Sequence, residues 1–350
     1  MLEQPPIAPS KGRSGRTKHR KRDYSMKLFP GVIGSAFVAL GLCNLAFAQQ
    51  DYPNRPITWV VPFAAGGVTD NAARFLSKGL GEKLGQPIVV ENKPGAGGIV
   101  GSEYVANSKP DGYTFLYGSS GPMTTIPATR KTLSYDAIKS FTPLYGMAVS
   151  PLVLVIAPDK PYKTFAEFVE YAKKNPGKLN FASIGTAAAQ HLTGEIFALG
   201  TDTDVVHIPY KATPVALTDI MSGTIDFMFE FQVVLKPLID SGKLRALATT
   251  AAKRLPGLPD VPTTAELGYP QITFNPWGTV VMPKDVPKPV ADKFISAFAE
   301  VMKDPATIEY YEKNGSQVLP PLPGEKLREF LVSERAKMNA IVEKAKIPIE

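Results

Sequence analysis

Small and polar residues directly follow four predicted strands of this chain. The four segments are residues 63–70, 118–121, 183–191 and 209–213. In the first, Gly66 and Gly67 come after a β-branched run, and apolar residues then recur about every four positions, which predicts a helix. A strand, a glycine turn and a helix start present unpaired backbone N–H groups to an anion, and the helix dipole favours the same charge. The pattern therefore indicates anion binding, although the two glycines could equally serve only to turn the chain into a βαβ unit.

We expect the four segments to converge on one ligand, because the carboxyl ends of parallel strands form ligand sites in α/β folds. No basic residue lies in 63–70, so backbone N–H groups and water would hold a carboxylate there, with Phe63 as an apolar wall. A bulky residue in place of Gly67 would block this approach to the backbone. The expected ligand-binding residues are Phe63, Ala64, Ala65, Gly66, Gly67, Val68, Asp70, Gly118, Ser119, Ser120, Ser183, Gly185, Thr186, His191, Tyr210, Lys211 and Glu230.

Four of these residues have a second interpretation. Asp70 would stabilise the helix dipole from the first turn whatever its role in binding. No serine–aspartate pair and no set of metal-ligating residues accompanies His191 in the sequence. We therefore expect it to form a hydrogen bond that supports the site, and not to act in catalysis. Lys211 could be a solvated side chain. Glu230, at a strand end, could pair with a ligand amine or cap the next helix.

The sequence lacks the residue spacing that known motifs of catalysis and cofactor binding require. Gly95 and Gly97 would need a third glycine at the position of Val100 to form a dinucleotide fingerprint, so segment 95–98 is predicted to be a turn where the backbone packs closely. The serines of 118–121 are not in a Gly-x-Ser-x-Gly elbow. Cys43 is the only cysteine, which excludes a thiol nucleophile from the remainder of the chain. We therefore predict no catalytic residue, no metal site and no cofactor.

The basic charge is confined to the start of the chain. Of the formal net charge of +7, residues 1–48 carry eight Lys/Arg against two Asp/Glu, or +6, which leaves +1 for the rest. A nucleic-acid footprint needs a basic face on the folded part, so we expect no nucleic-acid partner.

Residues 1–48 have the features of an export signal. Lys27 precedes the apolar run 28–45, and Ala46-Phe47-Ala48 is a small-x-small cleavage pattern, so we expect cleavage near Ala48 and release into the periplasm. The true start could be Met26. Leu42, before Cys43, disfavours a lipoprotein.

Strand and helix patterns alternate along the rest of the chain, which predicts an α/β fold with parallel strands. Thr164 and Glu167 form a capping box at a helix start. Two proline-bounded apolar strands, 151–158 and 277–283, suggest that the chain leaves one lobe, builds a second and returns. We expect lobe 1 to comprise 50–151 plus 273–350, lobe 2 to comprise 152–272, and a cleft to lie between them.

Several blocks in sequence order resemble the solute-binding receptors of tripartite tricarboxylate transporters, also called Bug-type receptors. The blocks are YPNRP (52–56), PFAAGGVTD (62–70), VENKPGAGG (90–98), PDGYT (110–114), QHLTGE (190–195), PYK (209–211), SGKLRALA (241–248) and PDVPT (259–263). One departure is Ala212, where the family more often has glycine.

The resemblance implies a two-lobed periplasmic binding protein of type II, a Venus flytrap with two crossover strands between its lobes. It implies a monomeric receptor, not an enzyme, that captures a small organic acid, which could be a carboxylate, an amino acid or an amide. The partner would be the inner-membrane permease of a tripartite transporter. Two alternatives remain: a periplasmic sensor with the same cleft but a signalling partner, and a secreted hydrolase, which the lack of a nucleophile–base pair disfavours.

Overall fold

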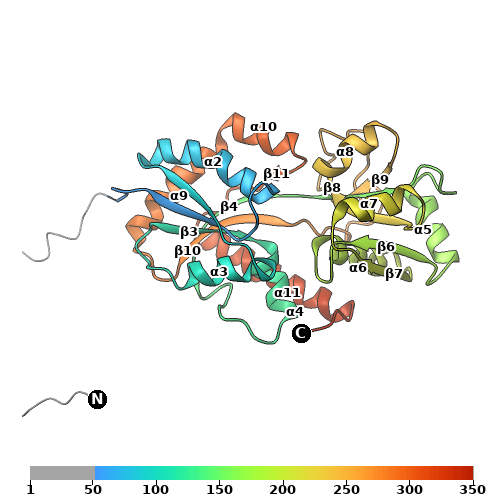
Figure 1. Ribbon diagram of the computed structural model, residues 1–350, viewed down its shortest axis with the longest axis horizontal. Coiled ribbons are helices and arrows are strands. Elements are labelled where there is room, and N and C mark those ends of the chain that lie inside the picture. Colours follow the sequence, from blue (N-terminus) through green and yellow to red (C-terminus); the bar gives the residue numbers. More distant parts are fainter. Residues whose placement is uncertain (1–51, 350) are drawn as a thin grey trace, which may run out of the picture. The chain divides into compact units, whose positions relative to one another are not determined.

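The computed structural model describes residues 52–349, so the predicted signal segment 1–48 lies outside the described residues. The strands form two sheets (Figure 1). The six-stranded sheet, in the order β11-β4-β10-β3-β1-β2, contains β1 (Ile57–Val61), β2 (Ile88–Asn92), β3 (Thr114–Ser119), β4 (Phe141–Val149), β10 (Trp277–Pro283) and β11 (Gln317–Val318). The five-stranded sheet, in the order β7-β6-β8-β5-β9, contains β5 (Leu152–Ile156), β6 (Leu179–Ser183), β7 (Val205–Pro209), β8 (Phe227–Phe231) and β9 (Arg245–Thr249).

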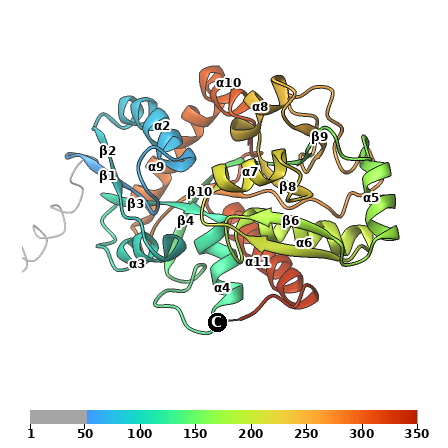
Figure 2. The same ribbon diagram turned by 45° about the vertical axis from the view of Figure 1, so that its right-hand side comes forward.

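Helices cover both faces of each sheet (Figure 2). Those against the six-stranded sheet are α2 (Val68–Leu84), α3 (Ile99–Ala106), α9 (Lys288–Lys303), α10 (Pro305–Lys313) and the first half of α11 (Glu325–Lys344), with the short turns η2 (Ala96–Gly98), η3 (Gly121–Thr125) and α4 (Ile126–Thr129). Those against the five-stranded sheet are α5 (Phe165–Lys174), α6 (Ala189–Thr201), α7 (Thr213–Met221) and α8 (Gln232–Asp240).

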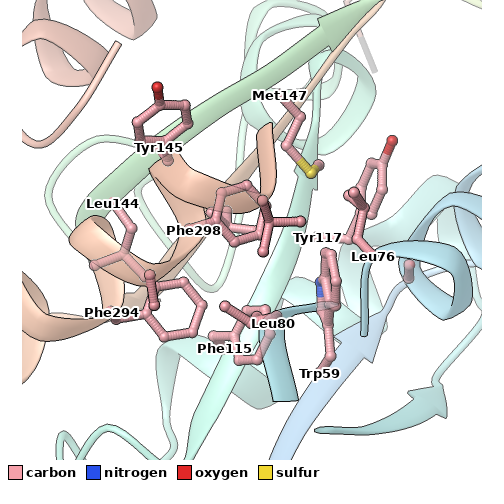
Figure 3. Close-up of a cluster of buried hydrophobic side chains, with 14 of the residues drawn as sticks. Trp59, Leu76, Leu80, Phe115, Tyr117, Leu144, Tyr145, Met147, Phe294 and Phe298 are labelled. Carbon is pink, nitrogen blue, oxygen red and sulfur yellow. The ribbon is translucent and has the colours of Figure 1, made fainter. Parts of the chain in front are cut away.

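Alternation along β1 builds the core of the six-stranded sheet. Ile57, Trp59 and Val61 point to one face, and Val60 points to the other. On the first face Trp59 packs on Phe115 of β3 with the ring centroids 4.8 Å apart, and Phe115 meets Phe294 of α9 at the same distance (Figure 3). These large buried side chains hold the carboxyl ends of β1 and β3 in fixed positions.

Helix α11 packs against the cores of both sheets. Leu327 and Leu331 belong to a cluster with β3 and β10, whereas Met338 and Val342, about two to three turns later, belong to the core of the five-stranded sheet. In the described residues, no helix is long and apolar enough to cross a membrane.

The chain passes between the sheets twice. It leaves β4 at Ser150 to enter β5, and it returns through Pro276 into β10, where the Ser150 N–H donates to the Pro276 carbonyl at 2.7 Å. The prediction that all strands are parallel is wrong. The two strands that these passages feed run against their neighbours: β5 is antiparallel to β8 and β9, and β10 is antiparallel to β3 and β4. The short strand β11 is also antiparallel to β4. A strand that arrives from the other sheet enters from the edge at which the parallel strands end, so it must run against them.

The predicted capping box is confirmed. The Thr164 side chain accepts from the Glu167 N–H, and the Glu167 carboxylate accepts from the Thr164 N–H, at the start of α5. Both bonds satisfy backbone donors that a helix start leaves unpaired.

Candidate functional site

A cavity of about 620 Å³ lies at the carboxyl ends of β1 and β3 on one side and of β6 and β8 on the other. Both sheets and both passages between them supply its walls. The lining residues are Phe63, Gly67, Val68, Thr69, Gly97, Tyr117, Ser119, Ser120, Gly121, Thr125, Ile126, Ser150, Ile184, Thr186, Ala187, Ala188, Ala189, Gln190, Phe231, Phe274, Pro276, Trp277 and Gly278.

The start of α2 faces this cavity. Gly67 is its N-cap residue, and no side chain caps this start, so the N–H groups of the first turn are available to a ligand. Gly67, Val68 and Thr69 all line the cavity. The 17 residues of α2 place the positive end of a helix dipole at the same point.

Asp70 holds the turn between β1 and α2 in shape. Its carboxylate accepts from the Gly66 N–H at 2.8 Å, from Arg74 Nε at 3.0 Å and from Asn92 Nδ2 at 2.9 Å, and Asn92 Nδ2 also donates to the Phe63 carbonyl. The hydrogen bond from Arg74 is the main cause that lowers the pKa of the Asp70 carboxyl to about 2. Asp70 itself is buried and does not line the cavity, so it positions the turn.

The end of β3 adds hydroxyl groups. Ser119 and Ser120 line the cavity, and the buried Ser119 hydroxyl has no hydrogen-bond partner among the described residues. Gly118 lies just outside the lining: a Cβ there would come within 2.7 Å of Thr279 Oγ1, whose hydroxyl donates to the Gly118 carbonyl. Gly118 therefore leaves room for the Thr279 side chain where β10 pairs with β3.

The five-stranded sheet presents a second helix start to the same cavity. Helix α6 has Ala188 as its N-cap residue, again without a side-chain cap, and Ala188, Ala189 and Gln190 line the cavity. Ala187 has a φ of +62°, which is unfavourable for a residue with a Cβ, and its N–H donates to His191 Nδ1 at 3.0 Å. This bond supports a strained residue of the kind found at ligand sites.

Two histidines stack beneath this second start. The rings of His191 and His207 lie 3.8 Å apart, and His207 Nε2 is 2.6 Å from the Ser183 hydroxyl. Ser183 also accepts from the Gly185 N–H at 3.0 Å. Burial lowers the pKa of His207 to about 4, and His191 acts in the same direction, so His207 is neutral at pH 7.

Glu230 lies behind the cavity wall. It is 1% exposed, and its carboxylate accepts from Gln190 Nε2 and Thr213 Oγ1, both at 3.1 Å, and from the Phe231 N–H at 2.7 Å. Burial is the main cause that raises its pKa. Glu230 therefore orients Gln190, which lines the cavity, and its own oxygens are occupied by protein donors.

The structure brings together only part of the expected site. The expected residues that line the cavity are Phe63, Gly67, Val68, Ser119, Ser120 and Thr186. Those that lie outside the lining are Ala64, Ala65, Gly66, Asp70, Gly118, Ser183, Gly185, His191, Tyr210, Lys211 and Glu230. Segment 209–213 contributes no lining residue, because the Tyr210 hydroxyl donates to Asp219 at 2.6 Å and Lys211 is exposed to solvent.

Several lining residues were missed from the sequence. Gly97 belongs to the glycine turn 95–98 that was assigned to packing alone. That packing is present, since a Cβ on Gly97 would lie 3.0 Å from Ile126 Cδ1 and one on Gly98 would lie 3.2 Å from Pro122 Cγ. Ser150, Phe274 and Pro276 lie on the two passages between the sheets. The only feature of the sequence that could have pointed to these three residues is the pair of proline-bounded apolar strands next to them.

The arrangement is suited to binding. None of the described residues that line the cavity carries a charged side chain, and no group of three or more metal-ligating side chains occurs in residues 52–349. A ligand would meet two helix starts and a few hydroxyl groups within largely apolar walls. Such a site can hold an anion by main-chain donors. The Ser183 hydroxyl, which contacts His207 Nε2, is fully buried and lies outside the lining, so it is not presented to a ligand.

Comparison with known proteins identifies relatives along most of the chain. Residues 72–347 match the model of the tripartite tricarboxylate transporter family receptor. Protein BugT of Bordetella pertussis is 33% identical over 312 residues, which are 89% of this chain and 95% of BugT.

Two solved structures are also similar. The periplasmic binding protein BugD is 36% identical with a TM-score of 0.71, covering 85% of this chain and 99% of that one. R. palustris Rpa4515 with adipate is 30% identical with a TM-score of 0.72, again covering 85% and 99%.

Proposed function

Because the chain belongs to the tripartite tricarboxylate transporter receptor family, we propose that it captures a small organic acid in the cavity between its two sheets and delivers it to the permease of such a transporter. Members of this family are periplasmic solute-binding receptors, so the chain is a receptor rather than an enzyme. The observation that carries the proposal is that the uncapped starts of α2 and α6 face one cavity from two different sheets.

A carboxylate suits these two starts. Each supplies backbone N–H donors and the positive end of a dipole, and charge-assisted hydrogen bonds contribute roughly 1.5–3 kcal/mol each. The adipate on the R. palustris relative supports a carboxylate ligand for this chain as well. We place Phe63, Gly67, Val68, Ser119, Ser120 and Thr186 against the acid, and we assign Asp70 and His191 to the shape of the two turns.

We further propose that the two sheets belong to two lobes that close on the ligand. Lobe 1 would comprise 50–151 plus 273–350 and lobe 2 would comprise 152–272, with the passages at Ser150 and Pro276 as the hinge. Export through a signal cleaved near Ala48 would deliver the receptor to the periplasm as a monomer. Co-purification with a permease, rather than with a sensor protein, is the expected outcome for a transport receptor.

Thermal unfolding of the protein purified from the periplasm, measured against carboxylates and amides, tests the central claim. At about a hundredfold excess over Kd a ligand adds roughly 2.7 kcal/mol to the free energy of unfolding. A panel without any stabilising acid, together with turnover of a substrate, would contradict the receptor assignment.

A matched pair of serine variants tests whether the end of β3 belongs to the acid-binding site. Ser119→Ala should leave stability nearly unchanged, because this hydroxyl has no protein partner, and should weaken acid binding about tenfold. Ser102→Ala alters another buried serine, which lies outside the cavity lining, and should leave affinity unchanged. Equal affinities in the two variants would remove the end of β3 from the site.

A further inference from the structure

The cavity contains no counter-charge for a cationic ligand group. Its described lining residues are all uncharged at neutral pH, and the nearby carboxylates have protein partners. Asp70 accepts from three donors within its own turn, and Glu230 accepts from Gln190, Thr213 and the backbone of Phe231. A ligand ammonium group placed in this cavity would therefore be buried without an anion beside it, which is strongly unfavourable.

Apolar and aromatic side chains supply much of the cavity wall, and most of the polar side chains come from one sheet or the other. Thr69, Ser119, Ser120 and Thr125 line the cavity from the six-stranded sheet, and Thr186 and Gln190 line it from the α6 side. On the passage between the sheets the Ser150 hydroxyl already bonds to Ser316 Oγ, at 2.9 Å. Much of the remaining surface belongs to the aromatic and aliphatic side chains of Phe63, Tyr117, Ile126, Phe231, Phe274 and Trp277, and the Trp277 Nε1–H already donates to Glu334. A hydroxyl group in the middle of a ligand would meet carbon on most sides and would lose its hydrogen bonds to water.

Two exposed apolar side chains flank the cavity from opposite sheets. Val68, in the first turn of α2, is 49% exposed, and Ile184, after β6, is 44% exposed, yet both line the cavity. Apolar surface that is exposed at the edge of a ligand site favours a ligand that covers it with carbon.

We propose that the acid bound in this cavity has an unsubstituted aliphatic or aromatic skeleton, and that the site selects against hydroxy acids and amino acids of the same length. The inference rests on the proposed function and sharpens it: the carboxylate group supplies the attraction, and the apolar wall sets the choice among acids. An apolar pocket rejects an added hydroxyl only moderately, by about 10- to 100-fold. It rejects an added ammonium more strongly, because that group brings a charge.

Two matched series of acids test the inference by isothermal titration of the periplasm-purified protein. One is 3-phenylpropanoate, 3-hydroxy-3-phenylpropanoate and 3-amino-3-phenylpropanoate; the other is glutarate, 3-hydroxyglutarate and 3-aminoglutarate. Within each series only the substituent on carbon 3, in the middle of the skeleton, changes. In any series that binds, the unsubstituted acid should bind tightest, with the hydroxy acid at least about 10-fold weaker and the amino acid at least about 100-fold weaker.

The outcomes separate this inference from the proposed function. A hydroxy acid or amino acid that binds as tightly as its parent overturns the inference and leaves the receptor assignment intact. If neither series nor any other acid of the broader panel binds, the proposed function fails as well.

Threonine variants tie the preference to the cavity wall. Val68→Thr and Ile184→Thr place a hydroxyl on exposed wall residues and should reduce the preference for the unsubstituted acid by about 3- to 10-fold. Val89→Thr is the matched control, because Val89 is 51% exposed on β2 and does not line the cavity. A preference that is unchanged in both wall variants, or equally reduced in the control, would contradict the assignment of selectivity to this wall.

Discussion

The side chains of Asp70 and Asn92 lie 2.9 Å apart and together hold the turn that presents the start of α2 to the cavity. Asn92 is the last residue of β2, and its amide also donates to the Phe63 carbonyl at 3.1 Å. Asp70 accepts in addition from the Gly66 N–H. The two residues thus connect the neighbouring strand to both ends of the turn, so the position of the binding donors depends on a network that lies outside the cavity.

Asp70→Asn should therefore impair stability and binding together. Three donors face the carboxylate, and an asparagine would direct an NH₂ group at one of them. We expect a loss of about 1–3 kcal/mol in the free energy of unfolding in urea, and weaker acid binding by titration calorimetry. Asp240→Asn, at an exposed ion pair with Lys236, is the control and should change stability by less than about 0.5 kcal/mol.

The lowered pKa of Asp70 predicts how the stability of the protein changes with pH. Its value in the folded protein, about 2, is below the ordinary value of 3.8, so the folded state binds fewer protons than the unfolded state between these values. The contribution to stability is complete above about pH 4 and is lost as the pH falls toward 2. Asp70→Asn should flatten the dependence of unfolding on pH in this window; an unchanged slope would show that the network does not depend on the charge.

The two glycines of the turn should respond differently to alanine. Gly66 has a φ of +80°, a conformation that costs alanine about 1 kcal/mol, whereas Gly67 has φ −78° and ψ 173°, which any residue adopts. Gly66→Ala should lower stability by about that amount. Gly67→Ala should fold normally, since its Cβ would meet only the Ala64 carbonyl oxygen at 3.5 Å, and should weaken acid binding at the start of α2.

Denaturant unfolding and calorimetric titration of the two variants separate these effects. Equal losses of stability in both would contradict the division of roles between the two glycines.

The bounds of a strand could be predicted from the sequence where an uninterrupted apolar run marked them. The bounds expected for β10, residues 277–283, match the structure, because an apolar run there ends at a proline. Strand β4 was missed, since Pro143 and Gly146 interrupt its pattern and its pairing with β10 shifts register beside Pro143. Proline can occur at such an irregularity, which only the partner strand reveals.

The sequence was enough to predict which segments reach the cavity, but not which residues of each segment line it. Three of the four expected segments reach the cavity, because the carboxyl ends of parallel strands share an edge. Which side chain turns inward depends on the partner that the folded chain offers it, as Asp219 is for Tyr210. Phe274 and Trp277 line the cavity only because the returning passage lies beside it.

Glu230→Gln tests whether this carboxylate meets the ligand. An amide keeps an acceptor for Gln190 and Thr213 but turns a donor toward the Phe231 N–H, so we expect a loss of about 1–2 kcal/mol in stability. Acid affinity should fall only modestly, through the looser Gln190. Selective loss of binding to an amine-bearing ligand, with acids unaffected, would instead place Glu230 in direct contact with the ligand.

The pKa of Glu230 gives this variant a pH signature of opposite sign to that of Asp70. Burial raises its value in the folded protein above the ordinary 4.5, so the folded state retains the proton longer and this group lowers stability as the pH rises through that range. Glu230→Gln should remove this decline, which unfolding curves at several pH values above 4.5 would detect.

His207 should act as a neutral support of the second turn. Its Nε2 contacts Ser183 at 2.6 Å, its ring stacks on His191, and Glu195 is the nearby carboxylate, 3.4 Å from His191 Nε2. Its folded pKa of about 4 is below the ordinary 6.5, so the unfolded state binds more protons between these values. Stability should be complete above about pH 6.5 and should fall by about 1 kcal/mol toward pH 4, an amount reduced for the solvent screening of a half-buried ring.

Proton NMR of the His207 ring checks this directly, with a midpoint expected near pH 4. His207→Gln keeps a group that can bond to Ser183 and removes the titration, so its stability should vary less with pH over the same window. Because residues 186–190 of the same turn line the cavity, acid affinity should weaken over that window in the wild-type protein and less in the variant. A His207 midpoint at or above 6.5 would show that the ring is solvated, and the support of the α6 start would then have to come from the bond between Ala187 and His191 alone.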